Sequence, residues 1–316
     1  MTKLIIQVPC YNEQGTLGLT LSALPRVVTG VDKVEWLIVD DGCTDGTVEI
    51  AKAHGVDHIV RLSLHQGLAK AFMAGLEASL GAGADIIVNL DGDNQYCADD
   101  IPKLVAPILS GKAEIVVGMR PISEIDHFSS AKKWMHRLGN SVVRFASRTD
   151  IPDAPSGFRA MSRNAAMRLN VFNEFTYTLE MIIQAGQKGM AIASVPIRVN
   201  EDLRPSRLVK SIPYYVRQAV ITIVRIFVVY RPFRFFMAIG TVLFSLGFLI
   251  GLRFLYYYCT GRGSGHLHSL ILASILLGIG FQTILVAFLS DLQAVNRRLM
   301  EDIQYRLRKM ETEDKR

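Results

Sequence analysis

The sequence lacks the cysteine patterns that mark a disulfide scaffold or a zinc site. Its 316 residues contain four cysteines, at positions 10, 43, 97 and 259, and no two of them form a CxxC pair. Neither a disulfide-rich secreted domain nor a zinc-finger module is therefore expected. Three of the four lie in the first hundred residues, which fits a reducing compartment.

Two nucleotide-binding fingerprints are also missing. The first predicted strand is followed by "PCYNEQGTL" where a dinucleotide fold would carry GxGxxG, and no P-loop lysine motif occurs. The chain carries a formal charge of +6 but shows no basic patch interleaved with aromatic residues. Because such patches stack bases, no nucleic-acid partner is expected.

Long apolar runs, by contrast, are present near the C-terminus. Residues 235–258 and 269–290 are each long and apolar enough for a helix that crosses a bilayer. The alternative for such runs is two buried core helices. Arginines crowd both outer flanks, whereas the loop between the runs carries one. The positive-inside rule then predicts an integral protein of the cytoplasmic membrane, with its N-terminal domain and C-terminal tail in the cytoplasm.

The first 200 residues alternate strand and helix patterns. Strands are expected at 3–9, 34–40, 57–62, 85–91 and 114–118, and helices at 14–27, 45–54, 67–81 and 99–110. This order predicts an α/β domain with a mostly parallel sheet. The expected domains are an α/β domain at 1–200, a basic loop and interfacial helix at 201–232, two membrane helices at 233–290 and a helical tail at 291–316.

Polar clusters follow three of the expected strands. They read "VPCYNE" at 8–13, "VDDGCTDGT" at 39–47 and "LDGDNQY" at 90–96. Parallel α/β sheets bind ligands at the carboxyl ends of their strands. Asp91 and Asp93 alternate along an extended segment and can project to a common side. Two such acids suit a hard cation such as Mg²⁺, although surface acids at this spacing are also common.

Together with "SGFRAMSR" and "RPSRLVKS", these clusters resemble the family 2 glycosyltransferases with a GT-A fold. Within that family the chain is most similar to the polyprenyl-phosphate glycosyltransferases, relatives of dolichyl-phosphate mannose synthase and bactoprenol glucosyltransferase. The resemblance covers nearly the whole chain. It implies a Rossmann-like GT-A catalytic domain followed by an interfacial helix and two transmembrane helices.

The resemblance also implies roles for particular residues. The matching nucleotide-sugar positions are Pro9, Asn12, Glu13, Asp40, Asp41, Asp91, Gln95, Arg204 and Arg207. Asp91, Asp93 and Gln95 match the group that holds Mg²⁺ or Mn²⁺ with the diphosphate. Arg120 matches a strand-end arginine, although Met119 before it departs from the usual residue. Arg137 and Ser141 match an acceptor-phosphate site, and they lie on one face of a predicted helix.

The activity implied is inverting transfer of one sugar from a nucleotide-diphosphate sugar, by default UDP-glucose, to polyprenyl phosphate. Two alternatives stay open. A processive polysaccharide synthase would usually carry QxxRW, which this sequence lacks. A non-catalytic membrane scaffold would keep the fold without turnover. The resemblance further favours a homo-oligomer such as a tetramer, which the apolar stripe on the tail could support.

The expected topology makes a prediction about Cys259, which begins the loop after the first membrane span. A membrane-impermeant maleimide applied to intact cells should label Cys259, because the loop that follows lies outside. The same reagent should not label Cys259 when it is applied from the cytoplasmic side alone. Labelling of Cys259 from the cytoplasmic side alone would reject this topology.

Overall fold

We describe the protein from a computed structural model. It describes residues 1–121, 144, 147, 149–171, 177–200, 221, 224, 225, 228–261 and 267–313. The chain divides into two compact units. One comprises Met1–Tyr215 with Glu301–Arg316, and the other comprises Val216–Met300. We call them the sheet unit and the helical-hairpin unit.

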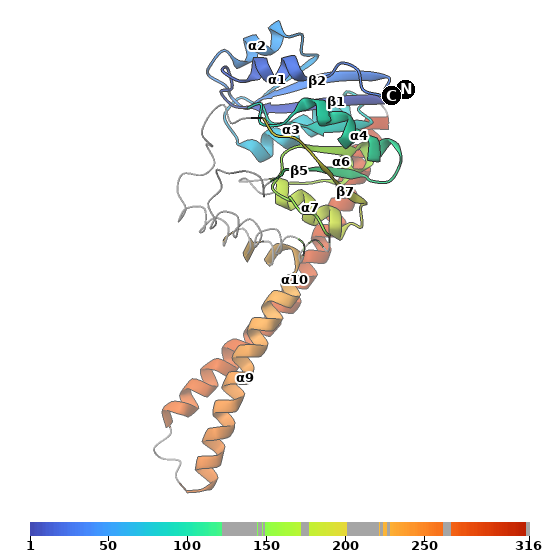
Figure 1. Ribbon diagram of the computed structural model, residues 1–316. Helices are drawn as coiled ribbons and strands as arrows, with labels where there is room; N and C mark the ends of the chain where they lie inside the picture. Colours follow the sequence, from blue (N-terminus) through green and yellow to red (C-terminus); the bar gives the residue numbers. More distant parts are fainter. Residues whose placement is uncertain are drawn as a thin grey trace. The chain divides into compact units, whose positions relative to one another are not determined.

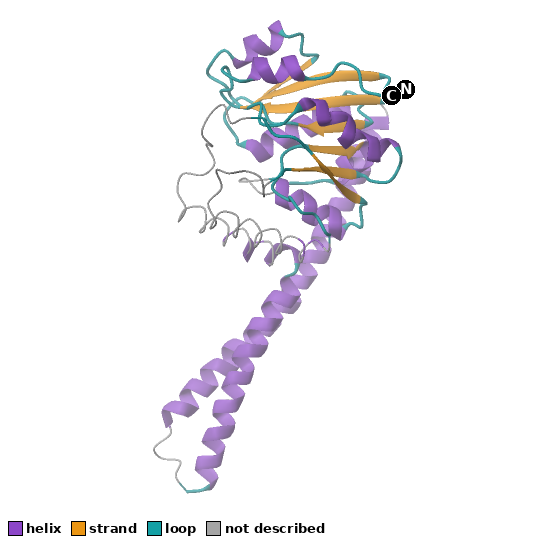
Figure 2. Cartoon of the chain, in the orientation of Figure 1, coloured by secondary structure: helices purple, strands orange, loops and turns teal. Residues whose placement is uncertain are grey.

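The sheet unit is built on seven strands in the order β3-β2-β1-β4-β6-β5-β7 (Figure 2). The strands are β1 (Lys3–Cys10), β2 (Lys33–Asp40), β3 (His58–Arg61), β4 (Ile86–Asn89), β5 (Ile115–Met119), β6 (Arg159–Ser162) and β7 (Ile192–Pro196). All pairings are parallel except those of β6, which runs antiparallel to β4 and β5. Most strand ends therefore meet at one edge of the sheet.

Helices cover both faces of this sheet (Figure 1). They are α1 (Leu17–Ala23), α2 (Thr47–Ala53), α3 (Leu68–Gly81), α4 (Ile101–Leu109), α6 (Arg163–Arg168) and α7 (Thr178–Gln187), with a short 3₁₀ turn at Ala98–Asp100. Leu4, Ile6 and Val8 share one core with buried residues of α1, α2 and α4. Gln7 points the other way and meets α3. Successive side chains of β1 therefore pack into the layers on the two opposite faces of the sheet.

The α/β fold class predicted from the sequence is confirmed, and so are its first five strands. The first helix is shorter than expected. It begins at Leu17 and ends at Ala23, since Pro25 disfavours a helical residue before it. The sequence reading missed β6 and β7. Both are short, and β6 pairs with strands far away along the chain, so local periodicity carries little signal for it.

Two long helices, α9 (Pro232–Cys259) and α10 (Leu267–Glu313), follow the sheet domain. Both are long and apolar enough to cross a membrane, and only 11% and 17% of their most apolar windows are buried. That exposure argues against the alternative of buried core helices. Glycines let the two helices approach closely, since a Cβ on Gly247 would lie 2.8 Å from the backbone nitrogen of Leu277. The expected interfacial helix lies mostly outside the described residues.

The tail expected at 291–316 is the continuation of α10, and its end packs on the sheet unit of the same chain. Arg308 is 9% exposed. Its guanidinium donates to the carbonyl oxygen of Leu169 at 2.8 Å and to Glu77 at 3.0 Å. Lys188 pairs with Glu301 at 2.9 Å. The apolar side chains of this segment, by contrast, face outward: Ile303, Leu307 and Met310 are each at least half exposed.

Loss of the Arg308 contacts should destabilise the sheet unit. Arg308→Ala removes buried charge-assisted hydrogen bonds, which contribute about 2 kcal/mol and correspond to a fall of roughly 4–8 °C in Tm. The matched control is Arg306→Ala, because Arg306 is exposed and pairs with Asp302 one turn away on the same helix. Thermal unfolding of the purified full chain measures both variants. Equal Tm values for the two would contradict the docking of the tail.

Candidate active site

The three polar clusters predicted from the sequence come together at the carboxyl edge of the sheet. Cys10 at the end of β1 pairs in register with Asp40 at the end of β2. The backbone nitrogen of Asp41 donates to the carbonyl oxygen of Cys10 at 3.0 Å. The side-chain oxygen of Asn12 accepts from the backbone nitrogen of Thr44 at 2.8 Å. Hydrogen bonds therefore join the first two clusters to each other.

The hydroxyl of Thr16 connects the first cluster to the third through hydrogen bonds. Its hydroxyl lies 3.0 Å from the carboxylate of Glu13 and 3.0 Å from the carbonyl oxygen of Gly92. Gly92 stands between Asp91 and Asp93. Glu13 is 9% exposed, and its charge acts on Asp91 to raise the pKa of that carboxyl. Three acids from two strand ends thus face one small region.

Asp40 and Asp41 are buried and bind backbone amides. The carboxylate of Asp40 accepts from the backbone nitrogen of Cys43 at 2.7 Å. That of Asp41 accepts from the nitrogens of Gln66 and Gly67 at 2.7 and 2.9 Å and pairs with His65 at 2.8 Å. These acids fix the loops that border the site. A contact of either acid with a nucleotide stays a prediction.

Asp91 is the electrostatic centre of the site. Burial raises the pKa of its carboxyl, and the charges of Asp93 and Glu13 raise it further, to about 7, against the lowering effect of Arg120 and Arg159. Gly157 lies directly against this carboxylate: a Cβ on Gly157 would stand 2.5 Å from Oδ2 of Asp91. A cation that approaches this carboxylate would stabilise its charged form.

Arg120 reaches this region from the end of β5, as the resemblance implied. Its Nε donates to Oδ2 of Asp153 at 2.8 Å and its Nη2 donates to Oδ1 at 2.9 Å. This two-point bond fixes the direction of the guanidinium. Although burial lowers the pKa of Arg120, the bond to Asp153 raises it, so the arginine stays charged. Asp153 is 1% exposed, and the sequence reading missed it.

The donor set of Asp91, Asp93 and Gln95 suits a divalent metal that is shared with phosphate oxygens. Among the described residues, no group of three His, Cys, Asp or Glu side chains forms a complete metal cage. Mg²⁺ is usually held by one or two carboxylates together with substrate phosphates, so a complete cage is not required. The raised pKa of Asp91 is the observation that favours a cation here, because a cation would relieve the repulsion from Asp93.

Residues 199 and 200, which lead into the basic loop, are bonded to the backbone at Gln95 and Tyr96. The backbone nitrogen of Asn200 donates to the carbonyl oxygen of Gln95 at 2.8 Å, and Val199 forms a β-bridge with Tyr96. Arg198 pairs with the buried Asp100 at 3.0 Å. Four predicted site residues lie outside the described part of the chain: Arg137, Ser141, Arg204 and Arg207. Pro9 is buried at the end of β1.

Two further charged residues of the sheet unit are buried. Arg159 is fully buried and donates to the carbonyl oxygens of Ser156 and Thr178, each at 2.7 Å. Glu180 is 7% exposed in α7.

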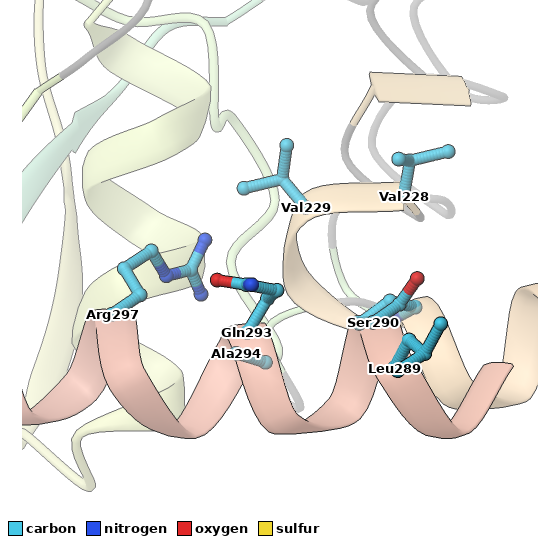
Figure 3. A pocket seen from close by; sticks show the side chains of 8 residues that line it. Val228, Val229, Leu289, Ser290, Gln293, Ala294 and Arg297 are labelled. Carbon is cyan, nitrogen blue, oxygen red and sulfur yellow. The ribbon is translucent and has the colours of Figure 1, made fainter. Parts of the chain in front are cut away.

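One cavity of about 320 Å³ belongs to the helical-hairpin unit (Figure 3). Gln293 and Arg297 extend from α10 on the side of Val229. Leu289 and Ser290 of the same helix also line the cavity. None of the strand-end residues lines this cavity. The guanidinium of Arg297 lies 4.6 Å from the ring centre of Tyr230 and so stacks on it.

The sheet and its acidic edge define a GT-A glycosyltransferase fold. The model of Glycosyl transferase family 2 matches residues 5–169, which is more than half of the chain. The chain belongs to this family, as the sequence motifs indicated.

Curated relatives are similar over most of the chain. An undecaprenyl-phosphate mannosyltransferase of Micrococcus luteus is 26% identical over 229 residues, which cover 69% of this chain and 91% of that protein. A UDP-N-acetylglucosamine–dolichyl-phosphate N-acetylglucosaminyltransferase of Methanococcus voltae is 29% identical over 216 residues, covering 60% and 83%. A polyprenol monophosphomannose synthase of Mycolicibacterium smegmatis is 24% identical over 208 residues, covering 62% and 77%.

Solved structures confirm the fold. Glucosyl-3-phosphoglycerate synthase of Mycobacterium tuberculosis, in complex with Mn²⁺, uridine diphosphate and phosphoglyceric acid, superposes with a TM-score of 0.55. It is 19% identical, and the alignment covers 72% of this chain and 78% of that one. At this identity the likeness shows the fold alone.

The raised pKa of the Asp91 carboxyl predicts that this side chain lowers the stability of the metal-free protein at neutral pH. Because the folded pKa of about 7 exceeds the unfolded value, the metal-free protein loses stability as pH rises towards 7, and the loss is complete above it. Asp91→Asn should therefore raise the free energy of unfolding at pH 8, by about 2 kcal/mol after a discount for partial exposure. The gain should shrink at pH 5.

Thermal unfolding in EDTA at the two pH values measures this effect. Asp150→Asn is the control, since the side chain of Asp150 is 92% exposed and should give no gain at either pH. A gain for Asp91→Asn that is independent of pH would mean that the Asp91 carboxyl does not titrate in this range.

Proposed function

We propose that the chain transfers a single sugar from a nucleotide-diphosphate sugar to polyprenyl phosphate at the cytoplasmic face of a membrane. The observation that carries this proposal is the convergence of Glu13, Asp91 and Asp93 beside the charged Arg120 at the carboxyl edge of the sheet. The names of the relatives support the acceptor, because those from Micrococcus luteus and Methanococcus voltae contain undecaprenyl phosphate and dolichyl phosphate. Two helices able to cross a membrane suit a lipid acceptor.

In this reaction the donor diphosphate lies against the acidic edge. Asp91, Asp93 and Gln95 would hold Mg²⁺ or Mn²⁺ there, and the bound ion would withdraw electron density from the leaving diphosphate. Arg120 is oriented by Asp153. Its Nη1 group bonds to no other described residue and would serve the phosphate oxygens. Arg204 and Arg207 are proposed to close over the diphosphate, because the chain enters their loop at Asn200 beside Gln95.

The nucleophile is a phosphate oxygen of the acceptor. A phosphate monoester has its second pKa near about 6, so it is largely ionised at neutral pH and needs no general base. This oxygen attacks the anomeric carbon as the bond from that carbon to the diphosphate breaks. Attack in line with the leaving group inverts the anomeric centre. Arg137 and Ser141 are proposed to hold the acceptor phosphate, so that catalysis rests on positioning.

The resemblance supports UDP-glucose as the default donor and a homo-oligomer such as a tetramer as the assembly. The name of the Methanococcus voltae relative contains a UDP-sugar as well. The basic flanks of the two helices support a cytoplasmic sheet unit.

The test incubates the full chain in nanodiscs with polyprenyl phosphate, Mn²⁺ and a panel of UDP- and GDP-sugars. Mass spectrometry should find one lipid product that carries a single sugar. Asp93→Asn should lower turnover by about a hundredfold, because it removes a carboxylate that would hold the metal ion against the leaving diphosphate. Asp99→Asn is the matched control, since Asp99 lies in the 3₁₀ turn that follows this cluster and its side chain is 77% exposed.

Two results would contradict the proposal. A ladder of products with several sugars would identify a processive synthase. Donor binding that depends on metal but yields no lipid product would identify a non-catalytic scaffold. Full turnover by Asp93→Asn would remove Asp93 from the catalytic group.

A further inference from the structure

Three neighbouring strands carry fully buried polar side chains at the same level of the sheet. Gln7 on β1 pairs in register with Asn89 on β4, and Asn89 pairs with Arg159 on β6. Each of the three is 0% exposed. Apolar residues occupy nearly all other buried positions of these strands. We call this set the polar row.

Hydrogen bonds join the polar row to the segment before α7. The amide nitrogen of Gln7 donates to the side-chain oxygen of Asn89 at 2.9 Å. The amide nitrogen of Asn89 donates to the hydroxyl of Tyr177 at 2.8 Å and to the carbonyl oxygen of Gly157 at 3.0 Å. The hydroxyl of Tyr177 donates to the same carbonyl at 3.3 Å. The ring of Tyr177 is fixed by stacking on Phe72, with 4.0 Å between ring centres.

Two of these bonds, from Asn89 and Tyr177, end on the carbonyl oxygen of Gly157, the residue that lies against Asp91. Tyr96 holds the other side of this peptide, since the backbone nitrogen of Gly157 donates to its hydroxyl at 3.0 Å. The site has no room for a side chain between Gly157 and the Asp91 carboxylate. The position of the Gly157 backbone therefore limits where that carboxylate can lie.

Neither Asn89 nor Tyr177 can touch a substrate, because both are completely buried. A buried polar group adds little net stability over a well-packed apolar residue, and it costs free energy when one bond is lost. Stability alone therefore gives weak reason for such a row in the middle of an apolar sheet. Its bonds converge instead on the one peptide that abuts the central carboxylate of the site.

We propose that Asn89 and Tyr177 are positioning residues: by binding the Gly157 carbonyl they hold its backbone against Asp91 and fix that carboxylate for the metal ion that Asp91 would help to hold. This inference rests on the proposed function, because it takes the metal site of that proposal as its object. Groups bonded behind a metal ligand typically change metal affinity by about tenfold or more when they are removed.

The test is Tyr177→Phe in the full chain, with Mn²⁺ binding in the presence of saturating uridine diphosphate followed by electron paramagnetic resonance. The variant keeps the ring that stacks on Phe72 and removes only the hydroxyl. The Kd for Mn²⁺ should rise by about tenfold at a temperature well below the unfolding transition. Tyr305→Phe is the matched control. It removes a hydroxyl that bonds Asn164 at 3.2 Å on the tail of α10, and it should leave Kd unchanged.

Tyr96→Phe is the second variant, because it frees the opposite side of the Gly157 peptide without touching the polar row. It too should raise Kd. A purely structural role would lower the Tm of Tyr177→Phe and leave Kd at the wild-type value, and that result would overturn the inference. Unchanged Tm and unchanged Kd would overturn it equally.

Mn²⁺ binding by the wild-type protein distinguishes failure of the proposed function from failure of the positioning role. If the wild-type protein binds no Mn²⁺, the metal site of the proposed function is lost and the positioning role falls with it. If the wild-type protein binds Mn²⁺ and Tyr177→Phe binds it equally well, only the positioning role is lost.

Discussion

Repulsion among carboxylates at one edge of the sheet is the constraint around which this protein is arranged. Asp91 and Asp93 leave β4 one residue apart, and Glu13 approaches from the end of β1. Such a group is unfavourable in isolation, and Arg120 offsets it only in part because that guanidinium is already bonded to Asp153. The proposed function follows from this imbalance, because such an edge would gain free energy if a divalent cation and a diphosphate bound there together. The stability lost at this edge and the donor binding proposed there have the same physical origin.

The topology of the sheet makes this arrangement possible. Parallel strands bring the ends of β1, β2 and β4 together, and the antiparallel β6 brings a different part of the chain, residues 153–159, to the same place. That segment supplies Asp153 to Arg120 and the bare backbone of Gly157 to Asp91. The α10 tail packs on the same unit through Arg308 and Glu301.

The sequence predicted the elements whose signal is local and missed those that depend on distant partners. The strand ends expected at residues 9, 40 and 91 followed from apolar runs that stop at polar clusters, and the strands end at Cys10, Asp40 and Asn89. Their convergence followed from parallel pairing. The strand β6 was missed because it is four residues long and its paired residues lie 42 to 76 positions earlier in the chain. Gln7 and Asn89 could have been noticed as polar residues inside apolar strands, but the sequence does not tell which groups satisfy them. Asp153 gained its role only from the fold that sets it beside Arg120.

Anomalous scattering from Mn²⁺ tests the central claim most directly. Crystals of the full chain would be grown with Mn²⁺ and a nucleoside diphosphate, and data would be collected at the manganese absorption edge. We expect one strong peak in contact with the Asp91 and Asp93 carboxylates and the diphosphate, beside Gln95. A bound nucleotide with no manganese at that edge, or with manganese held by other residues, would contradict it.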